Sequence, residues 1–128
     1  MAIRIFVVDD EHCIADTLAV ILRNAGYEAS AFYDAQSALE QAVFCSPDLV
    51  ISDVMMPGMN GVEMAVLIRE RYPECKVLLF SGHAATADLL SYAQRAGHLF
   101  TLLSKPVHPR DLLAWVSESL RPVSRVFA

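Results

Sequence analysis

The sequence predicts a single α/β domain built around a mostly parallel β-sheet. Short apolar runs rich in β-branched residues alternate with longer segments whose apolar residues recur at helical spacing. Five strands and five helices can be placed, and this alternation is typical of a parallel sheet covered by helices on both faces. The length of 128 residues fits one domain, and no linker, internal repeat or low-complexity tract divides it.

The first half of the chain contains three of the expected strands and two of the helices. Gly26 stands where a helix C-cap glycine belongs. Asp34 can cap the second helix, and Pro47 ends that helix. The expected elements are a strand over residues 3–8, a helix over 13–25, a strand over 27–32, a helix over 35–45 and a strand over 48–53. The helical residues expected to face inward are Ile14, Leu18, Ile21, Leu22, Ala38, Leu39, Ala42 and Val43.

The second half begins with a turn-rich loop over residues 55–61. Pro73 ends the helix after this loop, Gly97 ends the next helix, and Pro109 suits the first turn of the last one. The expected elements are a helix over residues 62–72, a strand over 76–80, a helix over 86–96, a strand over 99–103 and a helix over 110–120.

The composition limits the classes of protein to consider. Hydrophobic residues make up 55% and charged residues 20% of the chain. This composition allows a sizeable core and is too apolar for an intrinsically disordered segment. No apolar run reaches the roughly 18 residues of a membrane span, and no secretory signal is evident, so we expect no membrane association. The net charge of −5 argues against direct binding to nucleic acid. Widely spaced Cys13, Cys45 and Cys75 fit free, packed thiols in a reducing cytoplasm.

Polar side chains follow four of the predicted strands, at the point where each strand ends. Asp9 and Asp10 come directly after the first strand, and Asp53 ends the third. Ser81 follows the fourth strand, and Lys105 comes just after the fifth. Because sites in open α/β sheets form outside the carboxyl ends of the strands, we expect these five groups to converge at one edge of the sheet.

The chemistry of the five groups suits phosphoryl transfer. Three carboxylates brought together repel one another unless a cation neutralises them, and oxygen ligands suit Mg²⁺, with Mn²⁺ as an alternative. Lys105 offers a positive charge and Ser81 a hydroxyl donor for phosphate oxygens. A carboxylate can itself accept a phosphoryl group, and Asp53 is the candidate acceptor.

Taken alone, each of these residues has an ordinary structural explanation. An acid after a strand is often a turn or cap residue, a serine before a glycine is a common turn pair, and a single Lys-Pro pair carries little information. The joint pattern differs, because the groups follow four different strands and their charges suit one task. It therefore favours one functional site.

The segments that contain these residues resemble a known family. They are Asp9-Asp10-Glu11, Asp53-Val54-Met55-Met56-Pro57-Gly58-Met59-Asn60-Gly61, Phe80-Ser81-Gly82 and Lys105-Pro106. In this order, and over about residues 3–120, they resemble the receiver domain of two-component response regulators of the chemotaxis-regulator type. The pattern Asp-x-x-Met-Pro-x-Met-x-Gly is the most specific part of this resemblance.

The resemblance implies a fold and an activity. The fold would be a flavodoxin-like, doubly wound sheet of five parallel strands in the order 2-1-3-4-5, with five helices. The receiver domain would span residues 1–122, followed by a tail over 123–128. Asp53 would accept a phosphoryl group from a sensor histidine kinase or phosphotransfer protein, and binding to an unknown downstream protein would change. Such a domain assists its own phosphorylation and dephosphorylation, but it is not an enzyme that acts on other molecules.

The resemblance also implies roles for individual residues. Asp9 or Asp10, together with Asp53, would bind Mg²⁺, with the backbone carbonyl of Met55 as a further ligand. Ser81 would be the switch hydroxyl, and Lys105 would contact the phosphoryl group. The bond from Lys105 to Pro106 corresponds to the position of a cis peptide in the family.

The chain departs from the family pattern before Lys105. The family usually carries Tyr or Phe three residues before the lysine, where this chain has Leu102, and one extra residue follows Gly97. Phe100 could replace the aromatic residue if the insertion shifts the strand. Alternatively, the domain lacks aromatic coupling, which is the interpretation we favour.

The face formed by the fourth helix, fifth strand and fifth helix is where partners or a second copy dock in the family. Its composition permits a partner contact or a homodimer in this chain as well. The residues expected on this face are Leu89, Tyr92, Leu99, Leu112 and Trp115.

Three other functions are compatible with parts of the sequence. A Mg²⁺-dependent phosphatase or phosphotransferase for small molecules would use similar acids, although the short loops offer no substrate cap. A flavin or nucleotide binder would need a Gly-rich or Ser/Thr-rich phosphate loop after the first strand, where acids stand instead. A degenerate receiver would bind partners without phosphorylation, which the intact acids and Lys105 argue against.

Overall fold

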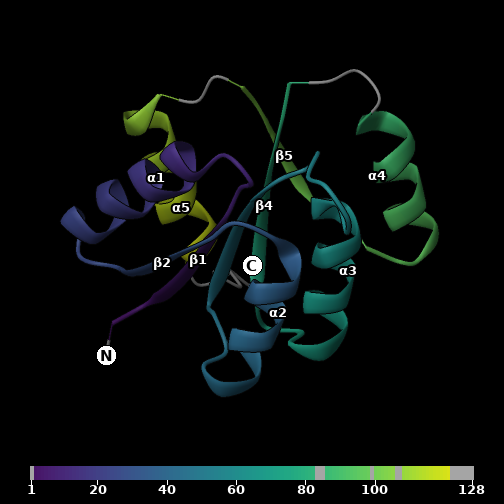
Figure 1. Ribbon diagram of the computed structural model, residues 1–128, viewed down its shortest axis with the longest axis horizontal. Coiled ribbons are helices and arrows are strands. Elements are labelled where there is room, and N and C mark those ends of the chain that lie inside the picture. Colours follow the sequence, from purple (N-terminus) through teal and green to yellow (C-terminus); the bar gives the residue numbers. More distant parts are fainter. Residues whose placement is uncertain (1, 83–85, 99, 106–107, 122–128) are drawn as a thin grey trace, which may run out of the picture.

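The computed structural model describes residues 2–82, 86–98, 100–105 and 108–121. These residues form five strands and five helices that alternate along the chain (Figure 1). The strands are β1 (Arg4–Val8), β2 (Glu28–Phe32), β3 (Leu49–Asp53), β4 (Lys76–Ser81) and β5 (Thr101–Ser104). The helices are α1 (His12–Asn24), α2 (Ala35–Phe44), α3 (Gly61–Arg71), α4 (Thr86–Arg95) and α5 (Pro109–Leu120). Each predicted element is present, with ends that differ by up to two residues.

The sheet has the strand order β2-β1-β3-β4-β5, and all neighbouring strands are parallel. Helices α1 and α5 cover one face, and α2, α3 and α4 cover the other (Figure 1). The chain leaves β1 toward β2 and then returns to place β3 on the other side of β1. This reversal puts the switch point of the sheet between β1 and β3, and it confirms the predicted flavodoxin-like, doubly wound fold.

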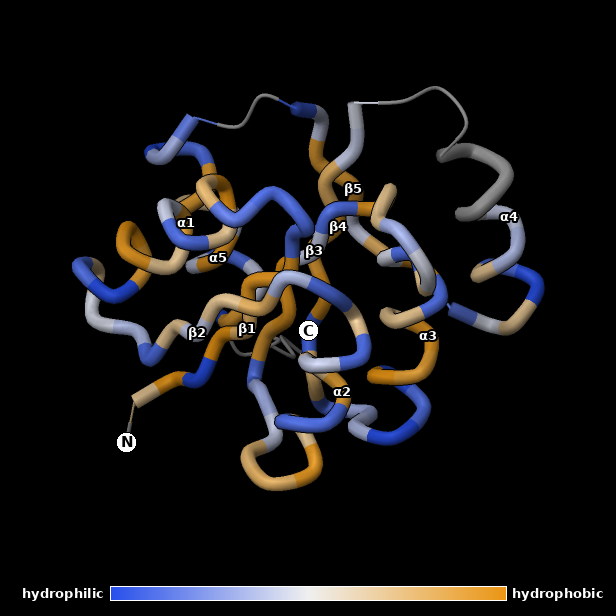
Figure 2. Tube along the Cα trace, viewed as in Figure 1, coloured by the Kyte–Doolittle hydropathy of each residue, from blue (hydrophilic) through white to orange (hydrophobic). Residues whose placement is uncertain are grey.

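Alternate residues of the central strands pack toward opposite faces of the sheet. In β1, Ile5 and Val7 belong to the core formed with α1 and α5, whereas Phe6 and Val8 belong to the core formed with α2 and α3. Strand β3 is buried along its whole length. Figure 2 shows hydrophobic residues concentrated in these central strands. The near-continuous apolar runs in the sequence thus reflect burial on both faces.

Helix α1 ends as the sequence predicts, at a glycine. Gly26 has a φ of 100°, in the region that only glycine adopts easily. Its N–H donates to the carbonyl of Arg23 at 3.0 Å, and the N–H of Tyr27 donates to the carbonyl of Leu22 at 3.1 Å. These two bonds satisfy the last carbonyls of the helix and direct the chain into β2.

The loop after β3 returns to the sheet at the start of α3. Asn60 and Glu63 form a reciprocal capping box, with side chain to backbone distances of 2.9 and 3.0 Å. The N–H of Gly61 donates to the carbonyl of Val54 at 2.8 Å. A Cβ at position 61 would clash with the backbone oxygen of Asp53, so only glycine allows this close approach.

Three expectations about side-chain burial were wrong. Val43 is 68% exposed, because the buried stripe of α2 ends at Ala42 and Val43 lies beside it in the last turn of the helix. Cys13 is exposed rather than packed, because it lies in the first turn of α1 on the side away from the buried stripe of that helix. Leu112 is fully buried in the core under α5 and does not belong to the outer face on which we placed it.

Other residues of that outer face are exposed. Tyr92 is 46% and Trp115 is 44% exposed, and Leu102 on β5 is 39% exposed. The side chains of Leu89 and Leu99 lie outside the described part of the chain.

The extra residue after Gly97 is accommodated before β5 begins. Leu102 pairs with Leu79, and Ser104 pairs with Ser81, so the strand keeps its register up to Lys105. Phe100 precedes the strand. Its ring lies 5.2 Å from the guanidinium carbon of Arg69 and stacks on His98 at a centroid distance of 6.0 Å. These contacts hold Phe100 against α3.

The close approach at Gly61 leads to a prediction about stability. Gly61→Ala would force the new methyl group into the Asp53 carbonyl, where backbone rather than a flexible side chain must move. We expect the free energy of unfolding to fall by about 3 kcal/mol or more, measured by urea denaturation. Gly82→Ala is the matched control, because its Cβ would lie an ordinary 3.8 Å from Cβ of Lys105. Equal unfolding midpoints for the two variants would contradict this account.

Candidate functional site

Three aspartates meet at the carboxyl ends of β1 and β3. Asp9 and Asp10 follow β1, and Asp53 ends β3. One carboxylate oxygen from each lies within 4.8 Å of the others. Asp9 and Asp53 are buried, at 1% and 7% exposure, whereas Asp10 is exposed. The adjacency of β1 and β3 therefore brings together acids that stand more than forty positions apart in the sequence.

Lys105 contacts this acid cluster from the end of β5. Its Nζ lies 3.2 Å from Oδ2 of Asp53 and 3.8 Å from Oδ2 of Asp9. The lysine side chain is 27% exposed, so its ion pairs lie at the border between the protein interior and water. One ammonium group faces three carboxylates, which leaves the cluster with an excess of negative charge.

Asp9 has the least favourable environment of the three acids. Burial raises its pKa, and the nearby carboxylates raise it further, while a bond from the Glu11 N–H at 3.0 Å and the Lys105 charge oppose the shift. Its Oδ2 is buried and has no hydrogen-bond partner among the residues that the structure describes. A buried carboxylate oxygen without a donor is costly, and the nearest positive group, the Lys105 ammonium at 3.8 Å, lies beyond hydrogen-bond distance.

A hard divalent cation fits this gap. The cluster offers only carboxylate oxygens, which are the donors that Mg²⁺ and Mn²⁺ prefer. The excess negative charge indicates a cation, and the Asp9 oxygen that accepts no hydrogen bond is free to serve as a ligand. Asp9, Asp10 and Asp53 are the residues that could hold such an ion.

Ser81 lies at the end of β4, next to the acid cluster. It is 8% exposed, and Phe80 before it pairs with Asp53 across the β3–β4 ladder. The N–H of Lys105 donates to the Ser81 carbonyl at 3.1 Å. The structure thus brings all five predicted polar groups to one edge of the sheet.

Met55 and Pro106 are the other two positions singled out in the sequence. Met55 lies in the loop two residues after Asp53 and is 42% exposed. Pro106, the position of the expected cis peptide, lies outside the described residues.

The sequence interpretation overlooked Ser52, which precedes the candidate acceptor. Ser52 is fully buried, and its hydroxyl donates to the backbone carbonyl of Asp53 at 2.8 Å. The sequence does carry a signal for it, since Ser52 is the one polar side chain that precedes Asp53 in an otherwise apolar buried strand.

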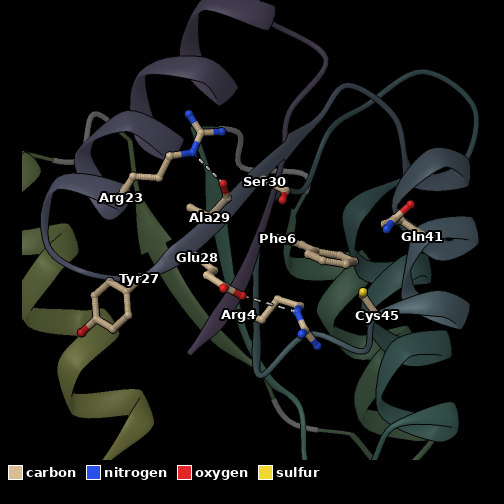
Figure 3. Close-up of a pocket in the computed structure, with 9 residues that line it drawn as sticks. All are labelled: Arg4, Phe6, Arg23, Tyr27, Glu28, Ala29, Ser30, Gln41 and Cys45. Atoms are coloured by element: carbon tan, nitrogen blue, oxygen red, sulfur yellow. Dashed lines mark hydrogen bonds and ion pairs between the residues drawn. The ribbon is translucent and has the colours of Figure 1, made fainter. Parts of the chain in front are cut away.

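A hollow of about 430 Å³ lies at the β2 edge, away from the acid cluster. Figure 3 shows Arg23 reaching back to the carbonyl of Ala29, at 2.8 Å, and the ion pair between Arg4 and Glu28, at 3.9 Å. Arg4 begins β1, so this hollow extends toward the amino ends of the strands. The Arg23 guanidinium donates to the outward-facing carbonyl of Ala29 on the edge strand β2. This bond hinders the pairing of a further strand at that edge.

Comparison with known proteins points to one family. The chain is 31% identical over 118 residues to the DNA-binding response regulator MtrA of Mycolicibacterium smegmatis. This match covers 92% of the chain but 50% of MtrA, so the chain spans about half the length of that relative.

Solved structures share the fold over nearly the whole chain. A CheY-like response regulator receiver domain protein from Methanospirillum hungatei superimposes with a TM-score of 0.84 at 29% identity, covering 94% of both chains. The chemotaxis protein CheY4 of Vibrio cholerae gives 0.83 at 28% identity, covering 94% of this chain and all of CheY4. NtrX from Brucella abortus gives 0.80 at 33% identity, covering 94% of this chain and 27% of NtrX.

The model of the response regulator receiver domain matches residues 5–117, a range that contains the acid cluster, Ser81 and Lys105. The fold, the convergence of these groups and this match agree, and the chain belongs to the response regulator receiver domain family of two-component signalling proteins.

Proposed function

We propose that the chain is a phosphorylation-dependent switch in which Asp53 accepts a phosphoryl group from a histidine kinase or phosphotransfer protein. The observation that carries this proposal is the pairing of Asp53 with Lys105 at 3.2 Å, beside an Asp9 oxygen that accepts no hydrogen bond from the described residues. A buried carboxylate that has an ammonium group on one side and a cluster of carboxylate ligands for a metal on the other is suited to accept a phosphoryl group. Membership of the family supports the same role.

Each residue of the site has a separate role in the proposed phosphoryl transfer. An oxygen of Asp53 forms a bond to phosphorus as the bond from phosphorus to the donor's imidazole nitrogen breaks, and the imidazole keeps the electron pair. Lys105 holds the acceptor carboxylate and offers its charge to the incoming phosphoryl oxygens. Asp9 and Asp10, with Asp53 and the Met55 carbonyl, would hold the metal. Mg²⁺, when bound, supplies charge neutralisation for the carboxylates and the phosphoryl oxygens.

We propose that Ser81 responds to phosphorylation of Asp53. It ends β4 directly after Phe80, which pairs with Asp53, so a phosphoryl group on Asp53 would attract its hydroxyl. Leu102 stands three residues before Lys105, and Phe100 is held by Arg69 and His98. We therefore propose that this domain signals without a switch aromatic, through movement of the β4 end and β5.

The partners follow from this role. A kinase or phosphotransfer protein would donate the phosphoryl group, and a downstream protein would bind according to phosphorylation. The exposed Tyr92, Leu102 and Trp115 are available for such a partner or for a homodimer. We propose a receiver domain over residues 1–122 with a tail over 123–128, acting in the cytoplasm without direct contact with nucleic acid. No helix among the described residues is long and apolar enough to cross a membrane.

Phosphorylation by a small donor tests the proposed function. We expect acetyl phosphate to add one phosphate to the protein only when Mg²⁺ is present, because the acid cluster repels the donor without a cation. Intact mass spectrometry measures the gain. Asp53→Asn keeps the shape of the side chain but removes the nucleophile, and we expect it to stay unmodified. A folded wild-type protein that gains no phosphate would favour the degenerate receiver.

The burial of Asp9 predicts how charge affects stability. Because the pKa of Asp9 is raised, ionisation of Asp9 destabilises the metal-free fold, and this penalty disappears as the pH falls through the raised pKa. Asp9→Asn keeps an acceptor for the Glu11 N–H and removes the charge. We expect a higher Tm in metal-free buffer at pH 7, by roughly 4 °C for each kcal/mol of relief. Added Mg²⁺ should stabilise the wild type more than the variant.

Asp34→Asn provides a control of opposite sign. Hydrogen bonds from Ser37 lower the pKa of Asp34, so its charge stabilises the cap of α2. This variant should lower the Tm slightly at pH 7 and leave the effect of Mg²⁺ unchanged. A loss of Tm in Asp9→Asn as large as that in Asp34→Asn would contradict the proposed role of the Asp9 charge.

A further inference from the structure

Ser52 forms a buried hydrogen bond that the surrounding strand does not explain. Its side chain is fully buried, and β3 is otherwise apolar before Asp53. A buried hydroxyl costs free energy unless it is hydrogen-bonded, and an alanine would fill most of this space without that cost. The Oγ of Ser52 donates to the carbonyl of Asp53 at 2.8 Å, so the hydroxyl serves the backbone of the next residue.

The Asp53 carbonyl lies where the β1–β3 ladder ends. Val8 is the last residue of β1 to pair with β3, and it pairs with Ser52. The N–H of Asp9 points to the other side of β1 and donates to the carbonyl of Phe32 on β2 at 3.0 Å. The Ser52 hydroxyl therefore supplies a donor to the Asp53 carbonyl at the end of the β1–β3 ladder.

Both polar groups of the peptide between Asp53 and Val54 are held. Its carbonyl accepts from Ser52, and its N–H donates to the Phe80 carbonyl on β4 at 2.9 Å. Gly61 closes over this peptide, since a Cβ at position 61 would lie 3.0 Å from Oγ of Ser52 and would clash with the Asp53 oxygen. The plane of the peptide is thus fixed from two strands and from α3.

We propose that Ser52 is a positioning residue for the metal and phosphoryl site, an inference that rests on the function proposed above. Fixing this peptide sets the backbone from which the Asp53 carboxylate extends and the direction in which the chain continues to Met55. Asp9 and Lys105 come from other strands, so their distances to Asp53 depend on that backbone. The hydroxyl holds the acceptor and the proposed carbonyl ligand in register with the rest of the site.

Ser52→Ala tests this role through metal binding as well as phosphorylation. Calorimetric titration of the unphosphorylated protein with Mg²⁺ should show affinity weaker by about tenfold, as for other groups that orient metal ligands. With acetyl phosphate, the Mg²⁺ concentration for half-maximal rate should rise by a similar factor. The rate at saturating Mg²⁺ should change less, because the metal then restores the arrangement.

Two sets of controls separate positioning from stability. Ser46→Ala removes another hydroxyl that donates to a backbone carbonyl, that of Ala42 at 3.4 Å, at the end of α2. This variant should leave Mg²⁺ affinity unchanged. Threonine and valine have the same shape and differ in the hydroxyl. We therefore expect the Mg²⁺ affinity to be retained in Ser52→Thr and weakened in Ser52→Val, even where both variants lose stability. Thermal unfolding in metal-free buffer records that loss for each variant.

Each outcome decides one of the two claims. A wild type that binds Mg²⁺ but gains no phosphate overturns the proposed function and leaves the Mg²⁺ titrations to decide the role of Ser52. A wild type that is phosphorylated, with Mg²⁺ affinity in Ser52→Ala within about twofold of it, overturns the positioning role. Equal Mg²⁺ affinity in the Thr and Val variants overturns it as well. Weaker binding in Ala and Val with recovery in Thr supports it.

Discussion

Mutual repulsion among three carboxylates at the switch point of the sheet is the constraint on which this site depends. Asp9, Asp10 and Asp53 lie within 4.8 Å of one another, and two of them are buried. In the part of the chain that the structure describes, Lys105 is the cation that contacts them. The fold holds this charge in place with apolar strands packed on both faces, and the divalent cation proposed above would relieve the repulsion.

The strand order explains how distant residues reach this point with little freedom. Asp53 extends from β3, the central strand, whose register is fixed by pairing on both sides with β1 and β4. Lys105 follows β5, which pairs on one side with β4 and whose outer residues are exposed. The proposed acceptor is therefore on the most constrained strand, whereas the lysine follows an edge strand that can adjust to a new charge.

Much of this arrangement could be predicted from the sequence, because parallel strands place their carboxyl ends together whatever the details of packing. The ten elements and the convergence of Asp9, Asp53 and Lys105 follow from that rule. The exposure of Val43 and the burial of Leu112 did not follow, because helical spacing alone does not say where the edge of a stripe lies. The Ser52 hydrogen bond and the close approach of Gly61 depend on a contact between strand and returning loop, which no local pattern records.

The same geometry bears on how a signal could leave the site without an aromatic residue on β5. The carbonyl of Ser81 accepts the N–H of Lys105, and Ser81 pairs with Ser104, so the serine and the lysine belong to one backbone ladder. A displacement of the Ser81 backbone toward a phosphoryl group would therefore move the end of β5, or break a bond whose loss costs about 1 kcal/mol. Leu102, two residues earlier on that strand, is 39% exposed on the outer surface. The backbone itself thus links Asp53 to a surface that a partner can contact, and Phe100, held against Arg69, need not move.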